Sequence, residues 1–334
     1  MKKFFSPSRL LSLLTLITFA LIACSPLQTA LLFTDSKTAE YSNTLLDQKA
    51  TNTFWEAFHA GQYERLKEVR TLLLAAYLEH PRNPDRSRLL GLSYLWTLSE
   101  RGRVAGLGPE VTDSAILAER YLSETYQLEP SDHRLPGFIG VLKLALGSIH
   151  QDPKQTVKGY YTILDAVKLY PEFNGFVLSL GLSEQPIGSE RFNESVDAMW
   201  KNLAICNGET INKNPDLATM TAQNQAFLDR ASQLTPRVRN VCLNTDKAPH
   251  NFEGFFLHFG DVLVKQGQVK AAKIMYAQAK LSPTYNQYPY KKLLEQHLEF
   301  ADDRAKAYQN PDPSKYPEMA GLSSVQCMIC HQSK

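Results

Sequence analysis

Two cysteines and a histidine stand close together near the C-terminus, in the segment SSVQCMICHQSK of residues 323 to 334. Their spacing, Cys327-x-x-Cys330-His331, is the attachment signature of c-type haem. Two thiols about one helical turn apart can add across the two vinyl groups of a porphyrin, and the adjacent histidine can bind the iron from one face. The motif therefore predicts covalent haem at Cys327 and Cys330, with His331 as the proximal ligand.

The motif resembles that of c-type cytochromes, and this resemblance implies one covalent haem c. Members of that family have more chain beyond the motif, often with a methionine that binds the iron, whereas only three residues follow His331 here. A sixth ligand must therefore come from upstream or from a partner, or be absent. The upstream candidates are Met319 and His297, followed by Met275 and His258.

Three alternatives to haem stay open for the same residues. Cys327 and Cys330 could form a redox-active disulfide, although a thioredoxin-like site needs a strand and a helix N-terminus around the two cysteines. The two cysteines and His331 could hold a metal ion, which would need a further ligand because zinc prefers four. The motif could also be the remnant of a lost domain.

The N-terminus predicts export from the cytoplasm. A short basic segment precedes an apolar run over residues 10–22, which is too short for a typical membrane span and typical of a cleaved signal. Residues 21–24, Leu-Ile-Ala-Cys, resemble the lipobox of bacterial lipoproteins, and the resemblance implies cleavage after Ala23 and lipid attachment to Cys24. An ordinary signal peptide with an incidental cysteine is the alternative. By similarity to the sorting rule of enteric bacteria, Ser25 implies an outer-membrane anchor facing the periplasm, with inner-membrane anchoring as a second option.

The two remaining cysteines are expected to pair. The periplasm is oxidising, so Cys206 and Cys242 are predicted to form a disulfide. Closing a loop of this length would stabilise the fold by about 3–4 kcal/mol on the loop-entropy model. Two independent buried thiols are the alternative.

The composition is that of a globular chain. Hydrophobic residues make up 43% and charged residues 21%, and the formal net charge is +2. This is enough apolar sequence for a core, and the charge does not favour a nucleic-acid partner. Apolar residues recur at helical spacing from about residue 40 to 308, with prolines and glycines between the stripes, so the sequence predicts an all-α fold.

One stretch resembles a tetratricopeptide repeat, in which two antiparallel helices pack closely. It is FFLHFGDVLVKQGQVKAAKIMYAQAKLSP, residues 255–283, with Gly260, Ala272 and Ala279 at small positions and Tyr276 beside them. The resemblance implies a solenoid of helix pairs. The segment from Phe58 to Gly102 is similar, more weakly, to the helical lipoprotein that accompanies TRAP-type transporters.

These observations predict five segments and no strong enzyme signature. Metalloprotease, hydrolase, dinucleotide and phosphate-loop motifs are absent from the sequence. The expected segments are a signal peptide at 1–23, a lipid-tethered linker at 24–45, a tetratricopeptide-like domain at 46–308 with an insertion at 207–250, and an extended tail at 309–334.

The leading hypothesis is a periplasm-facing lipoprotein with one haem c, serving electron transfer or a larger complex with a redox or protein partner. The alternative is a non-enzymatic scaffold whose repeat surface binds an envelope or transporter protein, with the tail disulfide-bonded or vestigial. Peroxidase-like catalysis at an open iron ranks third, because no acid or base residue is tied to the motif.

Overall fold

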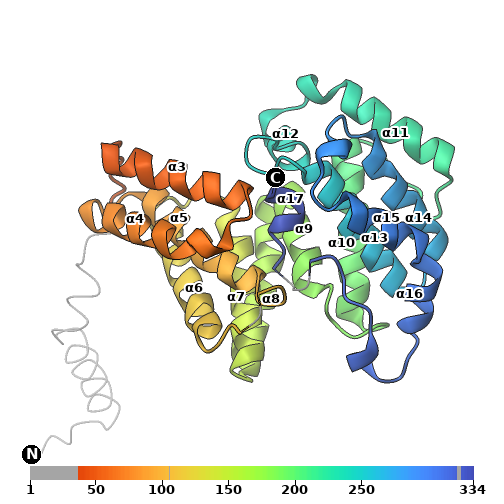
Figure 1. Ribbon diagram of the computed structural model, residues 1–334, viewed down its shortest axis with the longest axis horizontal. Helices are drawn as coiled ribbons and strands as arrows, with labels where there is room; N and C mark the ends of the chain where they lie inside the picture. Colours follow the sequence, from red (N-terminus) through yellow and green to blue (C-terminus); the bar gives the residue numbers. More distant parts are fainter. Residues whose placement is uncertain (1–36, 105, 322–324) are drawn as a thin grey trace, which may run out of the picture. The chain divides into compact units, whose positions relative to one another are not determined.

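Helices joined by turns make up the regular structure of the chain (Figure 1). The computed structural model describes residues 37–104, 106–321 and 325–334, and contains no strand within these ranges. The predicted all-α fold is confirmed. The expected signal peptide and Cys24 lie outside the described residues, and no helix inside them is long and apolar enough to cross a bilayer.

From Ala39 onward the chain forms one compact unit in which most neighbouring helices in sequence pack side by side. The first four pairs are α3 (Leu45–His59) with α4 (Leu66–Glu79), α5 (Pro84–Ser99) with α6 (Glu110–Leu128), α7 (Leu135–Ile149) with α8 (Pro153–Leu169), and α9 (Pro171–Leu182) with α10 (Glu190–Asn207). Then come α11 (Leu217–Asp229), α12 (Pro236–Cys242), α13 (Asn251–Lys265), α14 (Val269–Gln278), α15 (Lys291–Glu299), α16 (Ala301–Ala307) and α17 (Met328–His331). Short 3-10 turns η1 to η5 cover Tyr63–Arg65, Ala231–Gln233, Ala279–Leu281, Tyr285–Gln287 and Pro313–Lys315.

Prolines and polar caps decide where several helices begin. Pro84 and Pro153 occupy the first turns of α5 and α8, where a missing N–H costs nothing. Asn83 and Asp152 precede them, and their side-chain oxygens accept hydrogen bonds from backbone N–H groups of the first turn. Pro171 likewise begins α9, so the punctuation seen in the sequence marks helix starts as well as ends.

The pair α13 and α14 shows the close approach that the repeat resemblance implies. A Cβ atom on Gly260 would lie 2.2 Å from Cε1 of Tyr276, so only glycine allows this ring to fill the space between the helices. The Tyr276 hydroxyl donates a 2.6 Å hydrogen bond to Oδ1 of buried Asp261. A buried aromatic ring therefore sets the spacing of the pair.

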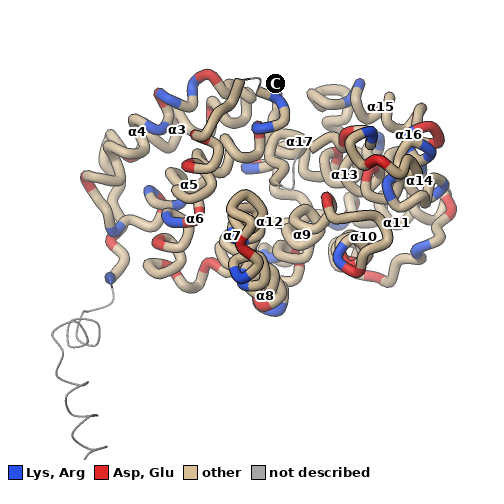
Figure 2. Tube along the Cα trace, turned by 90° about the horizontal axis from the view of Figure 1, so that it is seen from below, with Lys and Arg blue, Asp and Glu red and all other residues tan. Residues whose placement is uncertain are grey.

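The hydrophobic core has three clusters, which we name by position. The N-terminal cluster includes Phe54, Val69, Leu73, Leu90 and Trp96. The central cluster includes Leu122, Leu135, Leu142 and Ile163. The C-terminal cluster includes Met199, Phe256, Phe259, Tyr276 and Leu294. Basic and acidic residues are interspersed along the helices (Figure 2).

The C-terminal tail returns to this core. Residues 309–321 are mostly irregular, as expected of an extended segment, but Val325 packs in the central cluster and Met328 in the N-terminal cluster. Ile329 and Cys330 belong to the C-terminal cluster. Both views place α17 between the N-terminal helices and α13 (Figures 1 and 2), and α17 contacts α3 and α13. The tail therefore joins the three clusters.

The packing of Tyr276 predicts the effect of one added methyl group. Gly260→Ala should lower the free energy of unfolding by about 1–3 kcal/mol, because the Cβ forces the buried ring to move. Urea denaturation measures the change. Gly175→Ala in α9 is the matched control, since its nearest atom would be 4.0 Å away; it should stabilise by up to about 1 kcal/mol through helix propensity. Equal effects of the two substitutions would contradict this account.

Candidate functional site

The three residues of the terminal motif form one helical turn. Cys327 directly precedes α17, and its carbonyl oxygen accepts hydrogen bonds from the N–H groups of Cys330 at 3.2 Å and His331 at 3.0 Å. Gly254 of α13 permits this turn to pack closely, because a Cβ there would lie 2.5 Å from the Cys330 Sγ. The His250 N–H also donates a 2.9 Å hydrogen bond to the Cys330 carbonyl. The turn is thus held against α13.

Cys327, Cys330 and His331 line a cavity of about 420 Å³. This volume lies within the range of about 300–1,000 Å³ that is typical of small-molecule and cofactor sites. The wall comes from the first helices of four successive pairs, α3, α5, α7 and α9, and is completed by residues from 240 to 251 and by the tail. Much of it is aromatic, from Phe54, Trp55, Phe58, Phe138, Phe173 and Phe176.

His331 is oriented by a backbone contact. Its Nδ1 bonds the carbonyl oxygen of Lys247, and because a carbonyl only accepts, Nδ1 carries the hydrogen. Burial lowers the pKa of His331 to about 4, so the ring is neutral at pH 7 and Nε2 holds a lone pair. Metal-ligating histidines commonly bond their second ring nitrogen to a carbonyl in this way. The arrangement suits His331 to bind a metal through Nε2.

The two thiols are free and hidden from solvent to different degrees. Cys330 is buried and Cys327 is half-buried, and they are not joined to each other. Burial raises the pKa of the Cys327 thiol to about 12, and burial together with the nearby Glu253 raises the pKa of Cys330 as well. Redox-active cysteines instead have a lowered pKa, since the thiolate is the reactive form. The geometry therefore does not favour a redox disulfide at this motif.

The metal-site alternative finds no support in the described residues. They contain no group of three or more histidine, cysteine, aspartate or glutamate side chains placed to hold a metal ion. The additional protein ligand that a zinc site would need is therefore not seen in this part of the chain.

The upstream candidates for a sixth iron ligand lie elsewhere. His297 is buried and its Nδ1 bonds Oδ1 of Asp261 at 2.6 Å, while Met319 packs partly buried against the C-terminal cluster. Met275 and His258 are fully buried in α14 and α13. The structure brings none of the four to the cavity wall, and the described lining residues include no methionine and no histidine besides His331.

The cavity wall itself was not identified from the sequence. Its residues recur three or four positions apart on the first helix of each pair, for example Phe54 and Phe58 in α3 or Phe138 and Val141 in α7. The same spacing occurs on faces buried against neighbouring helices. The signal in the sequence would have been apolar residues that recur on the first helix of each pair. Finding it requires the helix pairs to be aligned with one another first.

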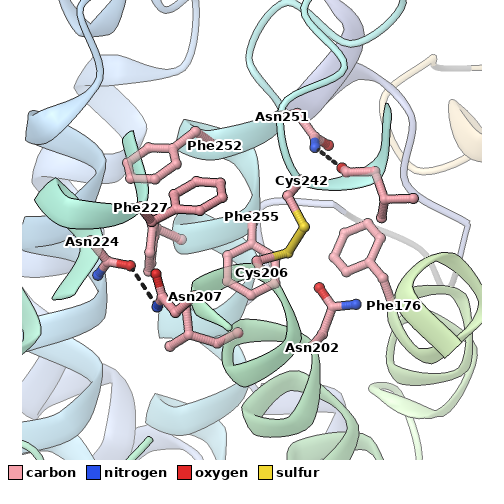
Figure 3. A pocket seen from close by; sticks show the side chains of 13 residues that line it. Phe176, Asn202, Cys206, Asn207, Asn224, Phe227, Cys242, Asn251, Phe252 and Phe255 are labelled. Carbon is pink, nitrogen blue, oxygen red and sulfur yellow. Dashed lines mark hydrogen bonds between the residues drawn. A yellow bond between two sulfur atoms is a disulfide. The ribbon is translucent and has the colours of Figure 1, made fainter. Parts of the chain in front are cut away.

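The predicted disulfide between Cys206 and Cys242 is confirmed, with a Cα–Cα distance of 5.7 Å (Figure 3). It links the ends of α10 and α12, and the segment after Cys242 supplies Lys247 to the motif. A pocket of about 40 Å³ lies beside it, where the Asn207 amide donates a 3.1 Å hydrogen bond to Asn224. This pocket has room for water but not for a cofactor.

Loss of the disulfide should destabilise the fold. We expect the double variant Cys206→Ser, Cys242→Ser to unfold with a free energy lowered by about 3–4 kcal/mol, because the unfolded chain gains loop entropy. Denaturation without reductant measures this change. Addition of reductant should lower the free energy of unfolding of the wild type to a similar extent and leave that of the variant unchanged. Equal free energies of unfolding for the oxidised wild type and the double variant would contradict the entropic account.

A buried histidine beneath the tail makes stability depend on pH. His258 is fully buried, its ring nitrogens lack hydrogen-bond partners in the described residues, and the Gln326 amide lies beside it outside bonding geometry. Burial lowers its pKa from 6.5 to about 4, so the unfolded chain binds the proton more readily between these values. His258 therefore favours the folded state above about pH 6.5, and this contribution declines as the pH falls towards 4.

We expect His258 to account for a loss of about 2 kcal/mol between pH 7 and pH 5. His258→Gln should therefore show a smaller loss over this interval in urea denaturation. Between pH 8 and pH 7 the free energy of unfolding should change almost equally in the two proteins, because both pH values lie above the pKa of histidine in the unfolded chain. Parallel curves from pH 7 to 5 would show that His258 is not the titrating group.

Comparisons with known proteins assign nothing further to this cavity. No protein-family model matches the chain, no curated protein matches it, and no solved structure matches it. The case for the site therefore depends on the terminal motif and on the cavity geometry.

Proposed function

We propose that this chain carries one covalent haem c on Cys327 and Cys330, with His331 as the proximal ligand, and serves electron transfer or a larger complex as its haem-bearing subunit. One observation carries the proposal: all three motif residues line the same cavity, on a single helical turn. A chance CxxCH at the end of a chain would have no reason to lie against a volume of this size.

The wall residues fit such a group. Aromatic side chains from α3, α7 and α9 offer apolar faces, and the Lys247 carbonyl holds the neutral His331 ring in place. Bound there, a haem would supply a one-electron couple. The protein would orient Nε2 of His331 towards the iron, and the apolar wall would keep water from much of the site.

The state of the thiols indicates when attachment occurs. Both are protonated at neutral pH in the folded chain, and Cys330 is covered by α13. Thioether formation is expected before the tail packs into place, while the thiols are accessible. Docking of residues 325–331 would then complete folding around the group.

The proposed location is the periplasmic side of the outer membrane, with the chain anchored by lipid on Cys24. Haem attachment to this motif and disulfide formation both belong to an exported protein, and the bond between Cys206 and Cys242 supports this compartment.

A scaffold role is the second candidate. The inner wall formed by α3, α5, α7 and α9 is the kind of surface on which helical-repeat proteins hold partners. The tail covers part of it and contributes Val325, Met328 and Ile329 to three core clusters. Deleting residues 309–334 would therefore disturb the fold as well as the motif, and point variants at the motif separate the two roles better.

The decisive experiment uses full-length protein exported from a host that attaches c-type haem. We expect the intact mass to include one haem, and a Soret band that remains with the chain after denaturation. Cys327→Ala or Cys330→Ala should weaken the covalent attachment or abolish it, since each removes one thioether.

The matched control is Cys206→Ser with Cys242→Ser, which removes two cysteines outside the motif. Because attachment is expected before the tail docks, this variant should retain the covalent haem even though its fold is weakened. A colourless wild-type protein from such a host would overturn the proposal.

A further inference from the structure

Arginines gather at one end of the cavity. Arg86 and Arg88 lie near the start of α5, and Arg134 directly precedes α7. All three line the cavity, together with the acidic Asp85 and Asp132. Guanidinium groups at the edge of a mainly apolar cavity need partners, because burying charge is costly unless it is paired.

Carboxylates hold these arginines in position. Arg134 makes two hydrogen bonds to Asp132, at 2.8 and 2.7 Å, and Arg88 contacts Glu129 at 3.3 Å. Arg88 also bonds Asp85 and contacts Asp132 at 3.5 Å. Their forks are therefore ordered before any ligand arrives, which reduces the entropy lost on binding.

Arg88 and Arg134 each have a side-chain nitrogen that donates no hydrogen bond to a described residue. No hydrogen bond is found from Nη1 of Arg134 or from Nε of Arg88 to any described residue. Arg86 also has a nitrogen without a hydrogen-bond partner among the described residues, Nε, which lies 3.4 Å from Oδ1 of Asp47, but its side chain is only 8% exposed. Arg88 and Arg134, whose side chains are 24% and 45% exposed, are therefore the pair that an additional anion can reach.

The arginines and the thiols lie at opposite ends of α5. Ser99, the last residue of this helix, lies beside the Cys327 thiol, and Val325 packs in the same cluster as Leu95 and Leu98. Arg88 is eleven residues earlier, which corresponds to roughly 16 Å along a helix. Between them, Leu92 and Leu95 line the cavity. The wall thus runs from arginines paired with carboxylates, through apolar side chains, to the thiols.

This order matches the chemistry of haem, whose two vinyl groups lie towards one edge and whose two propionates lie at the other. We propose that Arg88 and Arg134 bind the propionate carboxylates of the haem that Cys327 and Cys330 hold. The inference rests on the proposed function. Nε of Arg88 and Nη1 of Arg134 could each donate a charge-assisted hydrogen bond to a propionate oxygen, and this would fix the ring at the edge opposite its thioethers.

The test measures the haem of purified holoprotein rather than an activity. Arg134→Gln and Arg88→Gln should each lower the midpoint potential at pH 7, because removing a nearby positive charge favours the ferric state. Each should also shift the propionate bending mode in the resonance Raman spectrum, which responds to hydrogen bonds on the carboxylates. Arg134→Lys keeps the charge and should restore most of the potential while leaving the Raman mode shifted.

Arg191→Gln is the matched control, since Arg191 also pairs with a carboxylate, Glu194 at 3.2 Å, and does not line the cavity. It should leave potential and Raman mode unchanged. Where Arg88→Gln fails to fold, the Arg134 variants, whose side chain is 45% exposed, still decide the question.

The outcomes separate the two proposals. Covalent haem with potential and propionate mode unchanged in the Arg134 variants would overturn the arginine assignment and leave the proposed function standing. Absence of covalent haem from the wild type would overturn both.

Discussion

The contact between residues 325–331 and the inner faces of the helix pairs is the interaction on which the rest of the structure depends. Val325, Met328 and Ile329 each enter a different hydrophobic cluster, so a short segment removes apolar surface from water in three places at once. A solenoid usually has contacts only between adjacent repeats. Here the tail adds contacts between parts of the chain far apart in sequence, and it forms one side of the cavity of about 420 Å³.

The same contact gives the motif its chemical character. Withdrawal from water keeps both thiols protonated and His331 neutral, because charged forms are disfavoured where solvent is excluded. A neutral imidazole with one nitrogen on a carbonyl is suited to a metal, whereas a protonated thiol is poorly suited to exchange. Burial therefore disfavours thiol redox chemistry at these two cysteines in the folded chain.

The disulfide supports this site from a distance. It fixes the end of α12 to α10, and the segment that follows carries the Lys247 carbonyl to His331 and the His250 N–H to Cys330. The region between α10 and α13, which includes α11 and α12, therefore supplies backbone contacts to the motif. A link of this kind persists in an oxidising compartment.

The sequence by itself determined the helical class and the pairing of Cys206 with Cys242, because these follow from local periodicity and cysteine count. It also identified Cys327, Cys330 and His331, whose spacing is local. Their interpretation as a haem site stays a prediction, and so does lipid attachment at Cys24.

Only the tertiary structure decided that the tail folds back, that the motif meets an aromatic wall, and that Met319 and His297 lie away from the cavity. These features depend on contacts between residues separated by up to 274 positions, and no local pattern records which faces of distant helices will meet.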